Sequence, residues 1–428
     1  MNYEMIKSYL LVILIGVSIL LSVALWTYQP NYEQFQDPDY VNEVNIGGEE
    51  QEIRDLIAPK SIVFHDNKRA LGFSKPTDGE AFYESMQTWE MYDIEERQSN
   101  GAPNDRRYVE IIFPTEIPGE TIPNLFTFNS EIDLPNILFN RIYVTFNLDQ
   151  ASLNVHFVSI DESREYIATV EQQEHYELML DYVVNHKNLI DYTELSSNGD
   201  SSYVPNEQLN LTSKTLVISK IAPKKLVNAL FRDPSQVTPN DAEAYFTDGQ
   251  RGMNVSNNNS KIEFINPIQT SAEDDFKIDL LEQSIDNINE HRGWTNDYAL
   301  EDISASQSNV KFRLKYNGLP VFDLNNLTLI EQKWEAQELY EYNRSLIRLT
   351  HEVNSAEKTL PSGVELINYI ENQSLYDLNE IADIEVGYEL KFLSNASDSM
   401  LLEPNWYVKT KGQWELVDTD DLNIEGGE

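Results

Sequence analysis

The longest uninterrupted apolar stretch of the chain lies near its N-terminus, at residues 9–28. No charged residue falls between Lys7 and Glu33, and about 20 apolar residues in a helix span the hydrocarbon layer of a bilayer. Lys7 precedes the stretch and acidic residues follow it, which places the N-terminus in the cytoplasm by the positive-inside rule. The pattern predicts a cytoplasmic tail at 1–8, a transmembrane anchor at 9–28 and an extracytoplasmic remainder.

A cleaved secretory signal is the alternative interpretation of this stretch. The small residues Ser-Val-Ala at 22–24 suit a signal peptidase. However, Glu4 offsets the charge of Lys7, and the apolar run continues through Leu25 and Trp26, past the cleavage position. We therefore expect the anchor to be retained.

The predicted span also carries candidate contacts for other membrane helices. Small residues let a second helix approach closely, and a tryptophan suits the membrane interface. The positions that we expect to contact a partner helix are Gly16, Ser18, Ser22 and Trp26.

Beyond the anchor, the chain alternates between polar segments and short apolar runs typical of an α+β protein. Polar and acidic residues with two prolines and a Gly-Gly pair predict a stalk at 29–48. Three α+β domains are then expected, at 49–140, 141–268 and 269–428. The second and third share a crude order of strands and helices, which suggests that they are similar to each other.

Individual elements follow from the local spacing of apolar residues. A hairpin is expected around the Asp66-Asn67 turn. Helices are predicted at 79–97, 171–186, 224–231, 275–290 and 361–371. Strands are predicted at 61–64, 70–73, 108–113, 141–147, 153–160, 164–170, 215–221, 244–246, 262–265, 310–316, 319–322, 327–334, 338–350, 384–392, 402–409 and 413–417.

Composition indicates a folded and strongly acidic body. The hydrophobic fraction of 41% is too high for a disordered chain, although 72 acidic residues against 31 basic ones give a net charge of −41. Such a charge repels the phosphates of nucleic acid, so we expect no nucleic-acid partner. Cysteine is absent, which excludes disulfides and thiolate metal sites.

The residues that a hydrolase would need are missing or badly placed. The six histidines contain no pair at the four-residue spacing of a zinc protease, and there is no Gly-x-Ser-x-Gly. Ser355 and Lys358 match a Ser-x-x-Lys pattern, but Pro361 follows too soon for the helix that pattern needs. The acidic run at 418–421 lacks the glycine and glutamate of a calcium loop. We therefore predict that the protein is not an enzyme, with no catalytic, cofactor-binding or metal-binding residues and no cofactor.

A binding module for an exported peptide or a cell-wall component is the alternative function. Trp294, Trp334, Trp406 and Trp414 could stack on sugars, although packing in the core is the preferred interpretation. The acidic field would repel anionic polymers and attract a basic peptide.

Several stretches spread along the whole chain resemble the YycH family of accessory regulators. They are WTYQPNY at 26–32, LFRDPS at 230–235, YFTDGQRGM at 245–253, NP at 266–267, YNGLPVF at 316–322, GYE at 387–389 and PNWYV at 404–408. The last three also resemble the partner protein YycI. The family-motif residues are Arg232, Asp233, Pro234, Asp248, Gly249, Arg251, Gly318, Pro320, Gly387, Tyr388, Pro404 and Trp406.

The resemblance implies both an architecture and a function. It implies a three-domain exterior whose second and third domains are alike. It also implies pairing with a YycI-like single-pass protein and control of the sensor histidine kinase YycG, or WalK, of the cell-wall two-component system of Gram-positive bacteria. Contacts among transmembrane helices would carry this control; a homodimer is a further option, and no catalytic residue is implied.

The motif residues themselves are expected to form the scaffold rather than a binding surface. Asp248 and Gly249 suit a turn, the first for its side-chain hydrogen bond and the second for a positive φ. Arg232-Asp233-Pro234 is typical of a helix stop.

Overall fold

The computed structural model describes residues 44–419 apart from 133, 135–136, 198–199, 241–243, 257–258, 268–278, 336, 374–375, 378–379 and 394–397. The predicted anchor at 9–28 lies outside these residues. Within them, no helix has both the length and the apolar character needed to cross a membrane.

The first sheet contains ten strands among the described residues. Neighbouring strands are antiparallel except β3 and β5, which are parallel. In spatial order the strands are β10 (Asp200–Pro205), β9 (Leu189–Ser197), β2 (Arg69–Phe73), β1 (Ser61–Asp66), β4 (Arg107–Pro118), β6 (Leu138–Asn147), β7 (Ser152–Val158), β8 (Arg164–Val170), β3 (Glu90–Gln98) and β5 (Thr127–Phe128).

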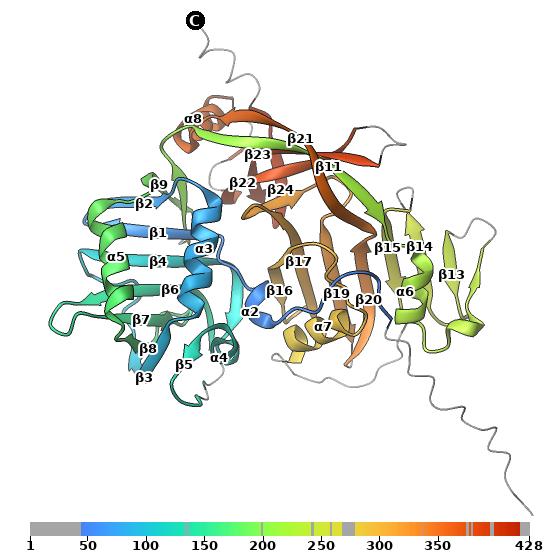
Figure 1. Ribbon diagram of the computed structural model, residues 1–428, viewed down its shortest axis with the longest axis horizontal. Coiled ribbons are helices and arrows are strands. Elements are labelled where there is room, and N and C mark those ends of the chain that lie inside the picture. Colours follow the sequence, from blue (N-terminus) through green and yellow to red (C-terminus); the bar gives the residue numbers. More distant parts are fainter. Residues whose placement is uncertain are drawn as a thin grey trace, which may run out of the picture. The chain divides into compact units, whose positions relative to one another are not determined.

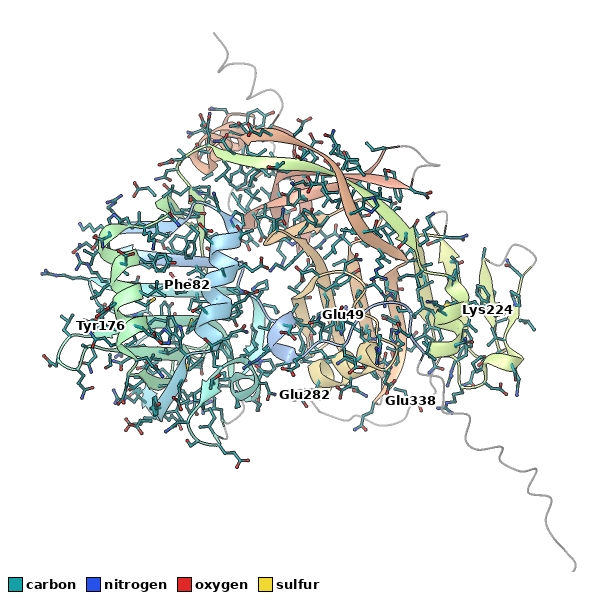
Figure 2. The ribbon with its side chains drawn as sticks, viewed as in Figure 1. Glu49, Phe82, Tyr176, Lys224, Glu282 and Glu338 are labelled. Carbon is teal, nitrogen blue, oxygen red and sulfur yellow. The ribbon has the colours of Figure 1, made fainter. Side chains whose placement is uncertain are left out.

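Two helices, α3 (Pro76–Gln87) and α5 (Gln173–Asn185), lie side by side across one face of this sheet (Figure 1). Apolar side chains recur every three or four residues on each helix and point at the strands, as the positions of Phe82 on α3 and Tyr176 on α5 illustrate (Figure 2). The core between the layers is aromatic. The ring of Phe82 lies 5.6 Å from that of Phe64 on β1, in an edge-on arrangement.

The second sheet contains fourteen strands among the described residues. Its path, in spatial order, is β12 (Thr238–Pro239), β13 (Tyr245–Thr247), β14 (Gly252–Ser256), β15 (Lys261–Ile265), β20 (Glu338–Ser345), β19 (Leu329–Glu335), β17 (Asn309–Tyr316), β18 (Leu319–Phe322), β22 (Ile381–Phe392), β23 (Ser399–Thr410), β11 (Leu209–Lys220) and β21 (Ile347–Leu360). Two strands lie off this path, β16 (Tyr298–Ser304) beside β17 and β24 (Gln413–Val417) beside β23. Among the strand pairs of this sheet that the structure describes, β18 and β22 are the parallel one.

Shorter elements complete the structure. The helices are α2 (Ile53–Leu56), α4 (Ile122–Leu125), α6 (Pro223–Leu230), α7 (Asp279–Asn289) and α8 (Gly363–Gln373), with single 3₁₀ turns η1 (Gly119–Thr121) and η2 (Pro234–Gln236). The strands β11 and β21 run together as a long ribbon across the top of Figure 1.

The expected α+β class is confirmed, and so are most of the predicted elements. The helices α5, α7 and α8 coincide with predicted helices, although the start of the one predicted at 275–290 lies outside the described residues. One helix prediction is wrong in its second half. The chain leaves α3 after Gln87 and forms β3, where pairing with β8 overrides an apolar spacing that suited a helix.

Strand β6 crosses residue 140, where a domain boundary was expected. It pairs with β4 on one side and with β7 on the other, so strands from both sides of that position share a sheet. The predicted strand at 338–350 divides at Leu346 into β20 and β21. Strands β9 and β10, which pair with each other in antiparallel, were not predicted from the sequence. The division into three domains stays a prediction.

Candidate functional site

The candidate helix contacts Gly16, Ser18, Ser22 and Trp26 lie outside the described residues, so their role stays a prediction. The family-motif residues are all described, and they fall into two groups at different places in the fourteen-stranded sheet.

The first group begins at the link between α6 and β12. The predicted helix stop is confirmed, because α6 ends before Arg232 and Pro234 opens η2. Asp233 caps this turn by accepting hydrogen bonds from the amide and hydroxyl of Ser235, at 3.1 and 2.5 Å. Arg232 is exposed, and its guanidinium lies 3.3 Å from the carboxylate of Glu338. These contacts shape the link.

The turn between β13 and β14 has the expected form. Asp248 Oδ1 accepts hydrogen bonds from the amides of Gln250 and Arg251 at 2.9 and 2.7 Å, and Gly249 has a φ of +90°. Burial opposes ionisation of Asp248, but the amide hydrogen bonds outweigh it and lower the pKa of its carboxyl. The Arg251 side chain is buried and donates to Asn266 Oδ1 at 3.3 Å. The polar side chains of this turn thus form hydrogen bonds within the scaffold.

The second group surrounds the parallel pair β18–β22. A Cβ on Gly387 would lie 2.4 Å from the Phe322 ring and 2.8 Å from the Pro320 carbonyl, so only glycine lets these strands approach. Gly318, with a φ of +77°, closes the β17–β18 turn and abuts Pro76, the first residue of α3. This turn is therefore one place where the fourteen-stranded sheet touches the helix layer of the ten-stranded sheet.

Side chains of the same group join this region to its surroundings. The Tyr388 hydroxyl donates to the carbonyl of Thr212 at 3.3 Å, and Pro404 faces Tyr388 across the β22–β23 ladder. Trp406 is 1% exposed and donates from Nε1 to the Pro361 carbonyl at 3.0 Å.

The tryptophans considered as sugar platforms are packing residues. Trp294, Trp334 and Trp406 are buried, and the Trp414 ring packs 5.4 Å from that of Phe322. The preferred interpretation from the sequence is thus confirmed for these rings.

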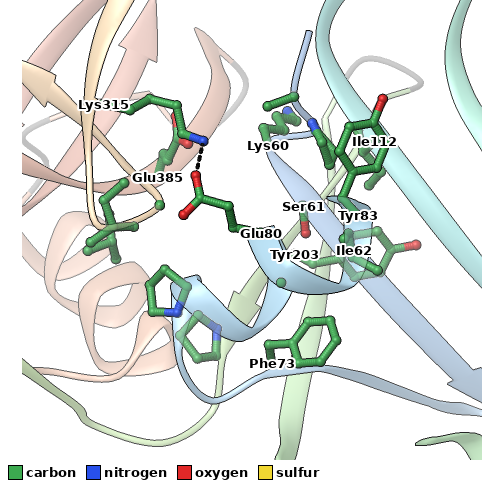
Figure 3. A pocket seen from close by; sticks show the side chains of 18 of the residues that line it. Lys60, Ser61, Ile62, Phe73, Glu80, Tyr83, Ile112, Tyr203, Lys315 and Glu385 are labelled. Carbon is green, nitrogen blue, oxygen red and sulfur yellow. Dashed lines mark hydrogen bonds and ion pairs between the residues drawn. The ribbon is translucent and has the colours of Figure 1, made fainter. Parts of the chain in front are cut away.

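A cavity of about 530 Å³ lies between the two sheets. We call it the inter-sheet cavity; Figure 3 shows side chains from both sheets pointing into it. Its lining includes Lys60, Phe73, Glu80, Tyr203, Lys315 and Glu385. No local sequence signal marked it, because its walls come from segments more than 300 residues apart.

Two charged contacts bridge the sheets beside this cavity. Lys60, which precedes β1, forms an ion pair with Asp383 on β22, and Ser202 on β10 donates to the same carboxylate at 2.7 Å. Lys315 on β17 lies 2.8 Å from the carboxylate of Glu80 on α3 (Figure 3). Each lysine is therefore paired with a carboxylate from the opposite side of the cavity.

Glu385 faces the same cavity. It follows Asp383 by two residues on β22, so both side chains point to one face of the strand. Burial and the charge of Asp383 raise the pKa of the Glu385 carboxyl to about 8, while Lys60 pulls it the other way. The carboxyl is consequently protonated at neutral pH.

The last residues of the predicted stalk are fixed to the fourteen-stranded sheet, so the stalk prediction at 29–48 is wrong at its C-terminal end. Three amides within residues 46–49 donate to three carbonyls within 291–294, the turn between α7 and β16, each at 3.1 Å. Asn289 holds the next residues, since its Oδ1 accepts from the Gln51 amide at 2.9 Å and its Nδ2 donates to the Gln51 carbonyl at 3.0 Å. We call residues 45–51 the N-terminal clamp; Figure 2 marks Glu49 within it.

Gly48 makes the clamp possible. A Cβ at this position would lie 2.4 Å from the carbonyl oxygen of Trp294 and 2.6 Å from that of Arg292. In the sequence, Gly47 and Gly48 were interpreted only as part of the polar stalk. The structure gives Gly48 a specific close contact that the Gly-Gly pair alone did not reveal.

Metal binding finds no support in the described part of the chain, where no group of three or more His, Asp or Glu side chains could hold an ion.

Comparisons with known proteins agree with the resemblance. The models of the YycH protein N-terminal and C-terminal domains match residues 4–187 and 199–423. The two-component system WalR/WalK regulatory protein YycH of Bacillus subtilis (strain 168) is 23% identical over 457 aligned residues, which cover 100% of this chain and 99% of that protein. The crystal structure of YycH from Bacillus subtilis matches with a TM-score of 0.72 at 21% identity, covering 88% of this chain and 100% of the other, which shows a shared fold. The chain belongs to the YycH family.

Proposed function

We propose that this protein is a non-enzymatic, single-pass membrane regulator of the sensor histidine kinase of a WalR/WalK-type two-component system. Its N-terminus would be cytoplasmic and its body extracytoplasmic, and a YycI-like single-pass protein would be its partner. Family membership and the name of the Bacillus subtilis relative support the regulatory role. In this proposal residues 9–28 contact the membrane helices of the kinase.

The observation that carries the mechanism is the N-terminal clamp. A helix can bias a kinase only if it binds its two signalling states unequally, and a difference of about 1.4 kcal/mol changes their ratio tenfold. A helix on a loose tether transmits little of the body's state. Here residues 46–51, from the end of the predicted stalk onward, are held by main-chain and Asn289 hydrogen bonds, and this attachment supports the proposal that the body positions the anchor.

The test replaces residues 9–28 with an unrelated membrane helix of equal length and measures kinase-dependent transcription. We expect the regulatory effect to be lost while the protein stays in the membrane at normal abundance. A matched control exchanges only Leu and Val residues of the span for each other and leaves Gly16, Ser18, Ser22 and Trp26 in place. Unchanged transcription with the foreign helix would contradict the helix-contact mechanism.

A further inference from the structure

The ten-stranded sheet has a second face, which α3 and α5 do not cover. Register identifies its residues, because side chains directly opposite each other on paired strands share a face. His65 on β1 faces Tyr108 on β4, and Glu110 on β4 faces Tyr143 on β6. Phe64, the neighbour of His65, instead points at α3 and α5, so this polar set lies on the opposite side.

This face is concave. Tyr203 on β10 is four strand positions from Glu110 on β4, a separation of about 19 Å in a flat sheet with strands about 4.8 Å apart. The Tyr203 hydroxyl nevertheless donates to the Glu110 carboxylate at 2.9 Å. The β9–β10 hairpin therefore curls back over β1 and β4 and encloses a cavity of about 550 Å³, which we call the sheet-face cavity.

A buried charged network forms the floor of this cavity. Glu110 is only 3% exposed; it forms an ion pair with Arg141 and lies 3.1 Å from His65 Nε2. Burial alone would raise the pKa of the Glu110 carboxyl, but His65 and Arg141 lower it, so the carboxylate is charged. Removing charged groups from water costs desolvation free energy. A sheet face whose only role is to contact solvent would not need to bury them.

Aromatic rings form the walls. Tyr108 stacks on His65 with ring centres 4.2 Å apart and meets Tyr143 edge-on at 6.1 Å, and Tyr203 meets His65 edge-on at 5.8 Å. The Tyr108 hydroxyl makes no hydrogen bond with any residue that the structure describes. Burial raises the pKa of this hydroxyl to about 12, so it stays a donor under physiological conditions.

The charges around the cavity nearly balance, in contrast to the acidic chain as a whole. The charged or titratable lining residues are Glu110, Glu162, Glu194, Lys68, Arg141 and His65. Such a site has little attraction for a strongly anionic or cationic ligand. The Tyr108 ring with its free hydroxyl, beside two further tyrosine rings and a paired carboxylate and guanidinium, instead suits a neutral ligand that has both apolar C–H faces and many hydroxyls.

We propose that the sheet-face cavity binds a neutral carbohydrate, which stacks on Tyr108 and takes hydrogen bonds from the Tyr143 and Tyr108 hydroxyls. Its volume falls in the range of about 300–1,000 Å³ that is typical of small-ligand sites. This binding would be separate from the proposed regulation of a kinase and does not depend on it.

The test measures binding of tetra-N-acetylchitotetraose and of maltotetraose to the full-length chain in detergent micelles, by saturation-transfer NMR titration. We expect saturable binding of at least one sugar. Tyr108→Ala should abolish it, and Tyr143→Phe, which keeps the ring, should weaken it roughly fivefold through loss of one hydrogen bond. Tyr166→Phe is the matched control, because Tyr166 on β8 is also a buried tyrosine but does not line the cavity.

Two results would overturn the proposal. One is the absence of saturable binding for both sugars. Trilysine serves as a further probe, and if it binds in a Tyr108-dependent way while neither sugar does, the cavity is assigned to a peptide. The other is sugar binding that neither Tyr143→Phe nor Tyr108→Ala changes, which would place the sugar elsewhere. Because Tyr143→Phe preserves packing, the outcome does not depend on whether Tyr108→Ala folds.

Discussion

At the scale of single residues, the glycines with close contacts tell more about the packing of the fold than the charged residues do, because charged residues are so numerous in this sequence. Gly48 and Gly387 each sit where a Cβ would fall within 2.4 Å of another atom. Neither position is explained by a local turn signal. Each is explained by a segment distant in sequence that packs against the main chain.

The first residue-scale prediction concerns the N-terminal clamp. Gly48→Val should detach the clamp, because the new side chain overlaps the Trp294 and Arg292 carbonyls, and overpacking of this kind costs about 1–3 kcal/mol. Hydrogen–deuterium exchange should then become faster for residues 45–51 and stay unchanged in the strands of both sheets.

Gly249→Asn provides the control for this variant. Asparagine tolerates the positive φ at this position, and no atom lies within 4 Å of the added Cβ. We expect unchanged exchange at residues 45–51. If residues 45–51 exchanged as slowly in Gly48→Val as in the wild-type protein, the clamp would not depend on the absence of a side chain at position 48.

At the scale of elements, α3 is held to the ten-stranded sheet mainly by aromatic packing. Phe82→Ala should lower the free energy of unfolding by about 3–5 kcal/mol, because the ring is buried against Phe64, Phe73 and Trp89 and its removal leaves a cavity. Chemical denaturation monitored by circular dichroism measures this change.

The exposed residue Thr77 on the same helix gives the comparison, since Thr77→Ala should change the free energy of unfolding by less than about 0.5 kcal/mol. Similar losses in the two variants would show that the packing of Phe82 is not what holds α3.

Elements with strong local patterns could be predicted, and the pairing between them could not. The helix α7 and the β1–β2 hairpin follow from apolar spacing and a turn. By contrast, the end of α3 after Gln87 depends on the pairing of β3 with β8, which is some 70 residues further along the chain. The turn at Asp248 was predictable because its hydrogen bonds are local. The sheet-face cavity was not, because Tyr203 and Glu110 come together only through the curl of the whole sheet.

At the scale of the whole molecule, the contact between the two sheets should respond to pH through Glu385. The raised pKa means that the folded protein keeps this carboxyl protonated between its ordinary pKa of 4.5 and about 8, whereas the unfolded chain does not. Its contribution to stability is therefore complete below about pH 4.5 and is lost as the pH rises through 8. We expect this loss to be about 1–3 kcal/mol, since the side chain is only half-buried.

Glu385→Gln should remove that part of the pH dependence and make the protein more stable than wild type at pH 9, as measured by urea denaturation from pH 5 to 9. Glu357→Gln, at an exposed position on β21, should leave the pH profile unchanged. Parallel profiles for wild type and Glu385→Gln would contradict the assignment.

The N-terminal clamp also has a mechanical consequence. When a short antiparallel pair of segments is pulled along its length, the force acts on all its hydrogen bonds at once. The bonds therefore break together rather than one after another. If residues 9–28 are held in a membrane, tension on the chain would reach the α7–β16 turn first, through the amides of 46–49. It would reach the ten-stranded sheet, which follows next in sequence, only after those bonds had yielded. The fourteen-stranded sheet, which comes later in the sequence, would thus be the part of the body that bears load from the anchor.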